Sequence, residues 1–128
     1  MQYFIPGTIV AVAVGPVEHV GILAGQTPDG RLTVISNSRR AGGVVEEPID
    51  SFAGGAKVRV LSYPGILAPA AVVWRARSRL GQRWNLFNWN CEHFVRWVHG
   101  LKPTSPQLWG GMTLLAIIAA GILLARSR

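Results

Sequence analysis

The single cysteine of the chain, Cys91, lies in the polar and aromatic stretch NWNCEHFVRW, residues 88–97. A structural cysteine normally behaves as a small apolar side chain, but Asn90 precedes this one and Glu92 and His93 follow it. Asn90 is a favourable N-cap, so Cys91 is predicted at the first position of a helix. The unpaired N–H groups and the positive dipole end of a helix favour a thiolate there. Cys91 is therefore a candidate nucleophile, and its own backbone N–H is a candidate oxyanion donor.

A thiolate nucleophile needs a general base within hydrogen-bond distance, and the chain has three histidines. His93 lies two positions after Cys91 and points to a different side of the predicted helix. His99 falls at the far end of that helix, where a cation suits the negative end of the dipole. His19 lies in the apolar, strand-like stretch EHVGILAG, and Gly21 on the same strand face leaves room beside it. His19 is the preferred base, whereas His93 is interpreted as a structural or solvent-facing residue and His99 as a C-terminal capping charge.

The segments that carry these residues have the patterns of a small α+β domain. β-branched runs and alternation of apolar and polar residues predict strands over residues 8–14, 17–24, 31–38, 44–47 and 56–63. Helices are predicted over 69–81 and 90–100, with Pro69 in the first turn of one, and Gly81 and Gly100 at the two ends. The predicted fold is a small antiparallel sheet with two packed helices, followed by a tail helix.

The tail, LWGGMTLLAIIAAGILLA from Leu108 to Ala125, has no charged side chain. As a helix rising about 1.5 Å per residue, it approaches the roughly 30 Å hydrocarbon thickness of a bilayer. The sequence therefore predicts a folded domain over residues 1–101, a linker over 102–107 and a transmembrane anchor over 108–125. Because the N-terminus lacks the pattern of a signal peptide, we expect a single-pass C-terminal anchor with the folded domain in the cytoplasm.

The chain is strongly basic, with a formal net charge of +7 and a pI of about 11.1. Several basic residues gather in WRARSRLGQRW, namely Arg75, Arg77, Arg79 and Arg83. They do not alternate with aromatic residues as a single-strand-binding surface would, so no nucleic-acid partner is predicted. Attraction to anionic lipid headgroups is the simpler interpretation beside a membrane anchor. A lone cysteine also excludes an internal disulfide and fits a reducing compartment.

Several of these segments together resemble the lecithin retinol acyltransferase-like family, a branch of the NlpC-type, circularly permuted papain-like thiol hydrolases. NCEHFV is similar to the family's cysteine motif, EHVGILAG to its histidine strand and IPGTIVAV to its opening proline-glycine strand. The stretch RARSRLGQRWNLFNWNCEHFV matches its helix, link and nucleophile helix in order. The resemblance covers most of Pro6 to Gly100. It implies a permuted papain-like fold in which the base, His19, precedes the nucleophile, Cys91.

The resemblance leaves the third catalytic residue open. In the family, a polar residue, commonly histidine, lies on the strand after the base and orients the imidazole. Here TVISNS occupies that strand and contains no histidine. Ser36 fits the matching place by the apolar pair before it, whereas Asn37 offers an amide oxygen that can accept from an imidazole N–H. Both are candidates. Because the strand lacks the family's histidine, the resemblance does not decide which of the family's substrates this chain uses.

Together these features predict a membrane-anchored hydrolase or acyltransferase, similar to the family's phospholipase-acyltransferases. It would act on acyl esters of lipids through an acyl-thioester on Cys91. Phospholipid, or another acyl substrate, and the membrane are the expected partners. One alternative is an amidase or cysteine peptidase of the same superfamily, and another is a non-catalytic membrane scaffold. The sequence contains no metal-ligand spacing and no glycine-rich phosphate loop, so neither a metal nor a cofactor is predicted.

Overall fold

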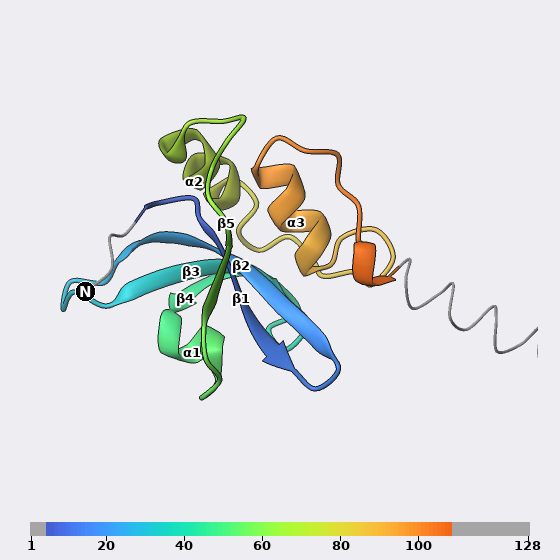
Figure 1. The fold of residues 1–128 in the computed structure, drawn as a ribbon, viewed down its shortest axis with the longest axis horizontal. Coiled ribbons are helices and arrows are strands. Elements are labelled where there is room, and N and C mark those ends of the chain that lie inside the picture. Colours follow the sequence, from blue (N-terminus) through green and yellow to red (C-terminus); the bar gives the residue numbers. More distant parts are fainter. Residues whose placement is uncertain (1–4, 109–128) are drawn as a thin grey trace, which may run out of the picture.

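A computed structural model describes residues 5–108 of the chain, which form an α+β domain (Figure 1). The strands are β1 (Ile9–Val14), β2 (Val17–Gln26), β3 (Leu32–Ser38), β4 (Gly43–Pro48) and β5 (Arg59–Ser62). The helices are α1 (Ile49–Ala53), α2 (Pro69–Arg77) and α3 (Cys91–Val98). The predicted α+β class and antiparallel sheet are confirmed within these residues.

The strands form one sheet in the order β4-β3-β2-β1-β5, and every neighbouring pair is antiparallel. Successive strands from β1 to β4 lie side by side because short turns join them, whereas β5 returns to the free edge of β1. The β1–β2 ladder runs from Ile9 opposite Ile22 to Val14 opposite Val17. The β2–β3 ladder is shorter and ends at the pair of Ile22 and Ile35. This difference determines the surroundings of Cys91.

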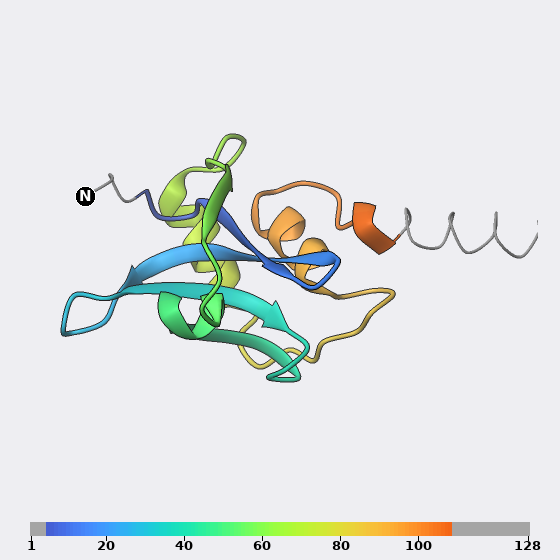
Figure 2. The same cartoon turned by 60° about the horizontal axis from the view of Figure 1, so that its bottom comes forward.

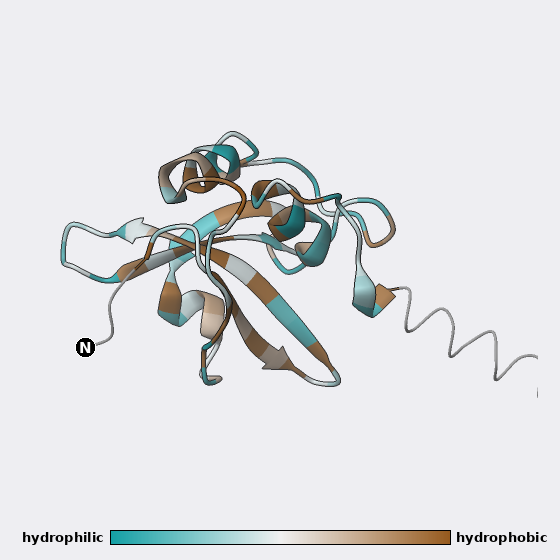
Figure 3. Ribbon diagram, turned by 45° about the horizontal axis from the view of Figure 1, so that its top comes forward, coloured by the Kyte–Doolittle hydropathy of each residue, from teal (hydrophilic) through white to brown (hydrophobic). Residues whose placement is uncertain are grey.

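The two faces of the sheet bury different apolar sets, because successive strand residues point to opposite sides. Helices α2 and α3 cover one face, and α1 covers the other (Figures 1 and 2). The α2–α3 face buries, among others, Val20, Ile22, Ile35 and Phe94. The α1 face buries Val10, Val12, Leu23, Val34 and Phe52. Hydropathy accordingly changes in bands along the strands (Figure 3).

Three elements differ from those predicted. Residues 49–53, where the sequence predicts no helix or strand, form α1, because Phe52 packs on the sheet and Gly54 closes the helix in the left-handed conformation at φ 56°. The helix predicted over 69–81 ends at Arg77, since the following turns carry Gly81 to a backbone hydrogen bond with Val44 of β4. The strand predicted over 56–63 is limited to β5, which is exposed along its length.

The predicted transmembrane anchor over 108–125 lies outside the described residues except for Leu108. Across residues 5–108, the model contains no helix with the length and apolar character needed to cross a membrane.

Candidate active site

Helix α3 begins with a capping box that fixes Cys91 at its first position. The side-chain oxygen of Asn90 accepts hydrogen bonds from the backbone N–H groups of Glu92 at 2.9 Å and His93 at 3.2 Å. In return, the His93 ring Nδ1 accepts from the Asn90 backbone N–H at 3.0 Å. Reciprocal bonds of this kind satisfy orphan donors of the first turn. The predicted N-cap is confirmed, and His93 serves the helix start rather than the solvent.

The Cys91 thiol lies against the edge of β2, where it donates to the Glu18 carbonyl oxygen over an Sγ–O distance of 3.9 Å. Burial raises the pKa of this thiol, and a hydrogen bond with the backbone of Val20 offsets only part of that effect. The helix start also acts in the lowering direction, while the Glu92 carboxylate raises the pKa further. Burial outweighs the helix start, so the pKa of Cys91 is raised, whereas the helix position alone predicts that it is lowered.

The His19 ring lies on the α1 side of β2. Its centroid is 5.0 Å from that of Phe52, with the two planes tilted by 34°. Burial lowers the pKa of His19; the Glu47 carboxylate acts in the opposite direction, and Arg40, which is paired with Glu47, acts in the same direction as burial. The imidazole is therefore held in its neutral form, which is the form that can accept a proton.

Gly21 lies on the same face of β2 as His19, as predicted, but the space beside it is occupied. A Cβ at Gly21 would lie 2.6 Å from Val34 Cγ1 and 3.0 Å from Phe52 Cε2. The missing side chain therefore lets β3 and α1 approach the strand closely. Gly21 thus helps to seat the aromatic ring against which the His19 imidazole rests.

The structure places the Cys91 thiol and the His19 imidazole on opposite sides of β2, and residues 5–108 show no direct hydrogen bond between the two side chains. The sulfur lies at the peptide group that joins Glu18 to His19, on the α3 side, while the imidazole extends toward α1. The predicted pair therefore shares one strand, but the imidazole does not face the thiol. Catalytic hydrogen bonds are often long or unformed in a free enzyme.

The two candidates for the third residue lie on opposite faces of β3. Asn37 faces α3 and donates from its side-chain nitrogen to the carbonyls of Trp89 at 2.5 Å and Asn90 at 3.4 Å. Ser36 lies two positions after Val34 on the same strand, so both side chains face α1, on the same side as the His19 ring. The Ser36 hydroxyl and the Asn37 side-chain oxygen are both buried, and neither has a hydrogen-bond partner within residues 5–108. The two residues therefore have different surroundings, with Asn37 tied to the segment before Cys91 and Ser36 on the side of the base.

His99 is the C-cap of α3, and Gly100 follows it at φ 83°, as predicted for the helix end. Its side chain, however, is not an exposed capping charge. It is buried, and its Nε2 lies 2.6 Å from the carbonyl oxygen of Gly7. The ring points inward, and its contact with Gly7 ties the segment before β1 to the end of α3.

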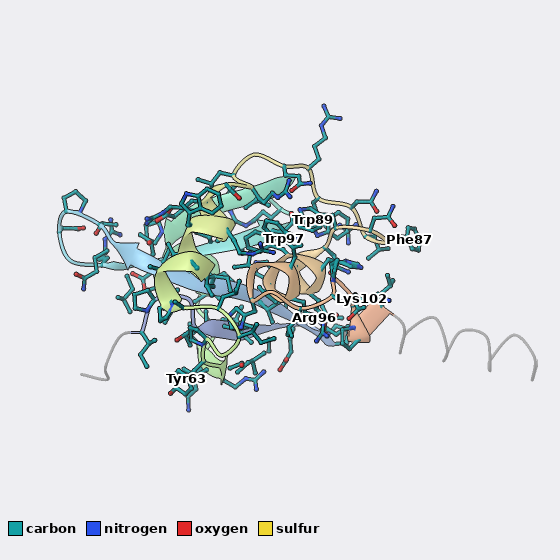
Figure 4. The ribbon with its side chains drawn as sticks, turned by 90° about the horizontal axis from the view of Figure 1, so that it is seen from above. Tyr63, Phe87, Trp89, Arg96, Trp97 and Lys102 are labelled. Carbon is teal, nitrogen blue, oxygen red and sulfur yellow. The ribbon has the colours of Figure 1, made fainter. Side chains whose placement is uncertain are left out.

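Three of the four clustered arginines have partners within the domain. The guanidinium carbons of Arg75 and Arg79 lie 3.9 Å and 4.4 Å from the centroid of the Trp97 ring. Arg77 forms an ion pair with Glu46 at 3.1 Å. In Figure 4, Trp97 and Trp89 lie together on one side of α3, with Arg96 and Lys102 on the other. Arg75 and Arg79 therefore join α2 to α3, which limits their availability to lipid headgroups.

The segment predicted as a linker supplies residues that the sequence analysis missed. The Ser105 hydroxyl donates to the Glu92 carboxylate at 2.6 Å and accepts from the Asn90 side chain at 3.0 Å. The Gln107 side chain contacts the Glu18 backbone on β2. No periodic pattern marks these residues, since each acts through a single side chain on a distant partner.

The domain thus combines a strand that carries His19, a cysteine at a capped helix start and an antiparallel sheet. The family model described as Lecithin retinol acyltransferase matches residues 4–102. The chain belongs to this family, and membership indicates an enzyme of lipid acyl transfer or hydrolysis. A search of curated proteins finds no match.

Proposed function

We propose that the protein is a membrane-bound cysteine acyltransferase or hydrolase that takes an acyl group from a lipid ester onto Cys91. The placement of the Cys91 thiol carries this proposal, because it lies at the start of a capped helix and beside the peptide group of His19. Attack of the sulfur on the ester carbonyl would form a thioester and release the alcohol. Water, or a lipid amine or alcohol, would then accept the acyl group.

Both groups are neutral at rest, which defines the order of proton movement. Burial raises the pKa of Cys91 and lowers the pKa of His19, so a stable thiolate–imidazolium pair is disfavoured. The thiol proton would therefore pass to the imidazole as the sulfur attacks, and the imidazolium would return it to the leaving alcohol. The backbone N–H groups at the start of α3 would stabilise the developing oxyanion.

Ser36 is the better candidate for the residue that orients His19. It lies on the imidazole side of the sheet with a buried, unpartnered hydroxyl, whereas the equally unpartnered side-chain oxygen of Asn37 lies on the opposite side. A buried hydroxyl without a hydrogen bond is costly, and an imidazole N–H is a partner that would satisfy it. Asn37 already donates to the Trp89 and Asn90 carbonyls on the opposite face. We therefore assign orientation of the base to Ser36 and support of the helix start to Asn37.

A hollow next to the nucleophile supports an acyl occupant. A cavity of about 250 Å³ lies between the sheet and α3. Apolar side chains dominate its lining: Ile9, Val20, Leu61, Val95, Leu101 and Pro106. Two neighbours of Cys91 are part of the cavity wall: Val20, whose backbone bonds with the thiol, and Glu92, the next residue in the chain. An acyl chain entering here would have its carbonyl end near the thiol.

We further propose that residues 108–125 anchor the protein in a membrane by a single C-terminal helix, with the domain in the cytoplasm. The stretch lacks charged side chains and follows directly after Gln107, which contacts the domain near the nucleophile. An anchor that begins here would keep Cys91 close to the lipid surface. Deletion of residues 109–128 should release the protein from membranes; retention of the truncated protein after a high-salt wash would contradict the anchor.

The test of the acyl-enzyme is the intact mass of the full chain after brief exposure to mixed phospholipid vesicles. Wild type should gain the mass of an acyl chain, removable by hydroxylamine, and Cys91→Ser should not form this thioester. Lysolipid should appear with the acyl-enzyme. If wild type forms neither product across a broad lipid panel, yet is acylated at Cys91 by a peptide amide substrate, the protein is an amidase of the same superfamily.

A further inference from the structure

The edge of β2 that faces β3 loses its strand partner beside the nucleophile. The ladder with β3 ends at Ile22 and Ile35, while β3 continues alongside β4 as far as Ser38. In an antiparallel strand the N–H and C=O of one residue point to the same side, and successive residues alternate. Glu18 and Val20 therefore direct their backbone groups, as Ile22 does, into the space from which β3 has diverged.

Side chains occupy the positions that a strand would have filled. The Gln107 side-chain oxygen accepts from the Glu18 backbone N–H at 2.9 Å, and its nitrogen donates to the Glu18 carbonyl at 3.0 Å. The amide thus satisfies both backbone groups of one residue, as a neighbouring strand does in a ladder. The Cys91 sulfur lies next along the edge, between the Glu18 carbonyl and the Val20 backbone. Gln107 and Cys91 therefore donate to the same carbonyl oxygen.

Gln107 is itself fixed to the start of the nucleophile helix. Its backbone N–H donates to the Glu92 carboxylate at 2.9 Å. The same carboxylate oxygen accepts a hydrogen bond from the Ser105 hydroxyl. The Ser105 hydroxyl in turn accepts one from the Asn90 side-chain nitrogen. Ser105 is buried. The segment from Ser105 to Gln107 therefore holds the residues on both sides of Cys91 and, through one amide, the residue before His19.

We infer that Gln107 is a positioning residue for acyl transfer: its side-chain amide holds the Glu18 peptide group, and with it His19, in register with the Cys91 thiol. This inference rests on the thiol function proposed above. Without the amide, the first four residues of β2 would have backbone ladder bonds only with β1, and the Glu18 carbonyl would face the sulfur alone. Val20 and Ile22 would still pack against α3, but near Glu18 the polar link between β2 and the start of α3 would be reduced to the thiol.

The charge state of a glutamate placed at this position distinguishes positioning from simple packing. A protonated carboxyl offers the same donor and acceptor as the amide, whereas a carboxylate offers no donor to the Glu18 carbonyl. The nearby charged groups are the Glu92 carboxylate on α3, the Glu18 carboxylate on β2 and Arg59 on β5, which is paired with Glu18. The negative charge of Glu92 favours protonation of a neighbouring carboxyl.

The experiment compares full-length wild type, Gln107→Ala, Gln107→Glu and the control Gln82→Ala, whose side chain is exposed. Two rates are measured from pH 8 to pH 5: alkylation of Cys91 by iodoacetamide, and appearance of the acyl-enzyme on mixed phospholipid vesicles. Near pH 8, Gln107→Ala and Gln107→Glu should form the acyl-enzyme at least about tenfold more slowly than wild type. Both should also alkylate more slowly, because the unscreened Glu18 carbonyl disfavours the thiolate. Gln82→Ala should match wild type.

The decisive result is the rate of Gln107→Glu divided by that of wild type at each pH. We expect this ratio to rise toward one as the pH falls and the introduced carboxyl gains a proton. A ratio that stays flat overturns the inference, even if Gln107→Ala fails to fold. If wild type forms no acyl-enzyme, the proposed function fails, whereas the alkylation ratio still tests the contact between Gln107 and the thiol edge.

Discussion

The two ends of β2 are built differently. From Ile22 to Gln26 the strand is flanked on its β3 side by backbone, and its inward side chains belong to the buried core. Toward Glu18, that side is completed by the Cys91 thiol and the Gln107 amide, which come from the far end of the chain. One end is a regular sheet, and at the other end individual side chains satisfy the backbone.

This difference gives the Cys91 thiol a place at the edge of an otherwise ordinary sheet, beside the peptide group of His19. A continuous β3 would fill the edge beside His19 and leave no position for the thiol. Divergence of β3 creates that position, while the side-chain amide keeps the exposed peptide groups from being left unpaired. The regular end therefore contributes mainly to stability and the open end to chemistry, and substitutions should separate the two contributions.

The largest expected effect is at the open end. His19→Ala should reduce turnover by roughly 10²–10⁴-fold, the usual contribution of a general base, without unfolding the domain. Acyl-enzyme formation and circular dichroism measure the two properties. Gln82→Ala is the control: its side chain is exposed, and the variant should keep the turnover of wild type. Loss of activity in His93→Ala, with His19→Ala still active and both folded, would identify His93 as the base.

The regular end should respond in stability instead. Ile22 is fully buried between its neighbours on β1 and β3, and Ile22→Ala should lower the free energy of unfolding by about 2–5 kcal/mol. Val17, at the other end of the strand, is half exposed, and Val17→Ala should change that free energy by less than about 0.5 kcal/mol. Denaturant titration gives both values. Equal losses at the two positions would show that the open end is as tightly packed as the regular one.

The adjacent residues of β3 sharpen the comparison across the sheet. Asn37→Ala should lower the free energy of unfolding by about 1–3 kcal/mol, because buried carbonyls before Cys91 lose their donor. Ser36→Ala should leave stability unchanged or improve it, since its hydroxyl has no partner within the described residues. It should slow turnover about tenfold, because the hydroxyl proposed to orient the imidazole during the reaction is lost. Full turnover in Ser36→Ala, with slow turnover in folded Asn37→Ala, would reverse the assignment.

The smallest effect concerns pH. Burial lowers the pKa of both His19 and His93, so the unfolded chain binds protons more readily than the folded domain. The contribution of the two neutral histidines to the free energy of unfolding should therefore be fully present above the unfolded histidine pKa of about 6.5. It should be lost as the pH falls through their lower pKa values in the folded domain. Melting temperatures from pH 8 to pH 5 measure this slope. His19→Gln should make the slope shallower; an unchanged slope would mean that His19 is equally accessible to protons in both states.

The parts of the site that the sequence predicted are those with a local signal. Apolar runs bounded by glycine and turn residues located β2 and β3. Asn90 before Cys91 indicated the capped helix start, because N-capping depends on residues only a few positions apart. The five residues of α1 are too few to show a helical period. Gln107 left no local signal because its partner, Glu18, lies 89 positions away. The raised pKa of Cys91 was likewise unpredicted, since it depends on burial against a strand from elsewhere in the chain.

The Gln107 contact also has a consequence for biosynthesis. The sheet and the histidine strand are translated first, and the amide that completes the edge of β2 is translated nearly ninety residues later. The bond between His99 and Gly7 spans 92 positions and also forms late. Because contacts between distant residues form slowly, a nascent chain can hold both His19 and Cys91 while their alignment is still incomplete. The enzyme would thus become competent for acyl transfer only when the segment leading into the predicted membrane anchor has been made.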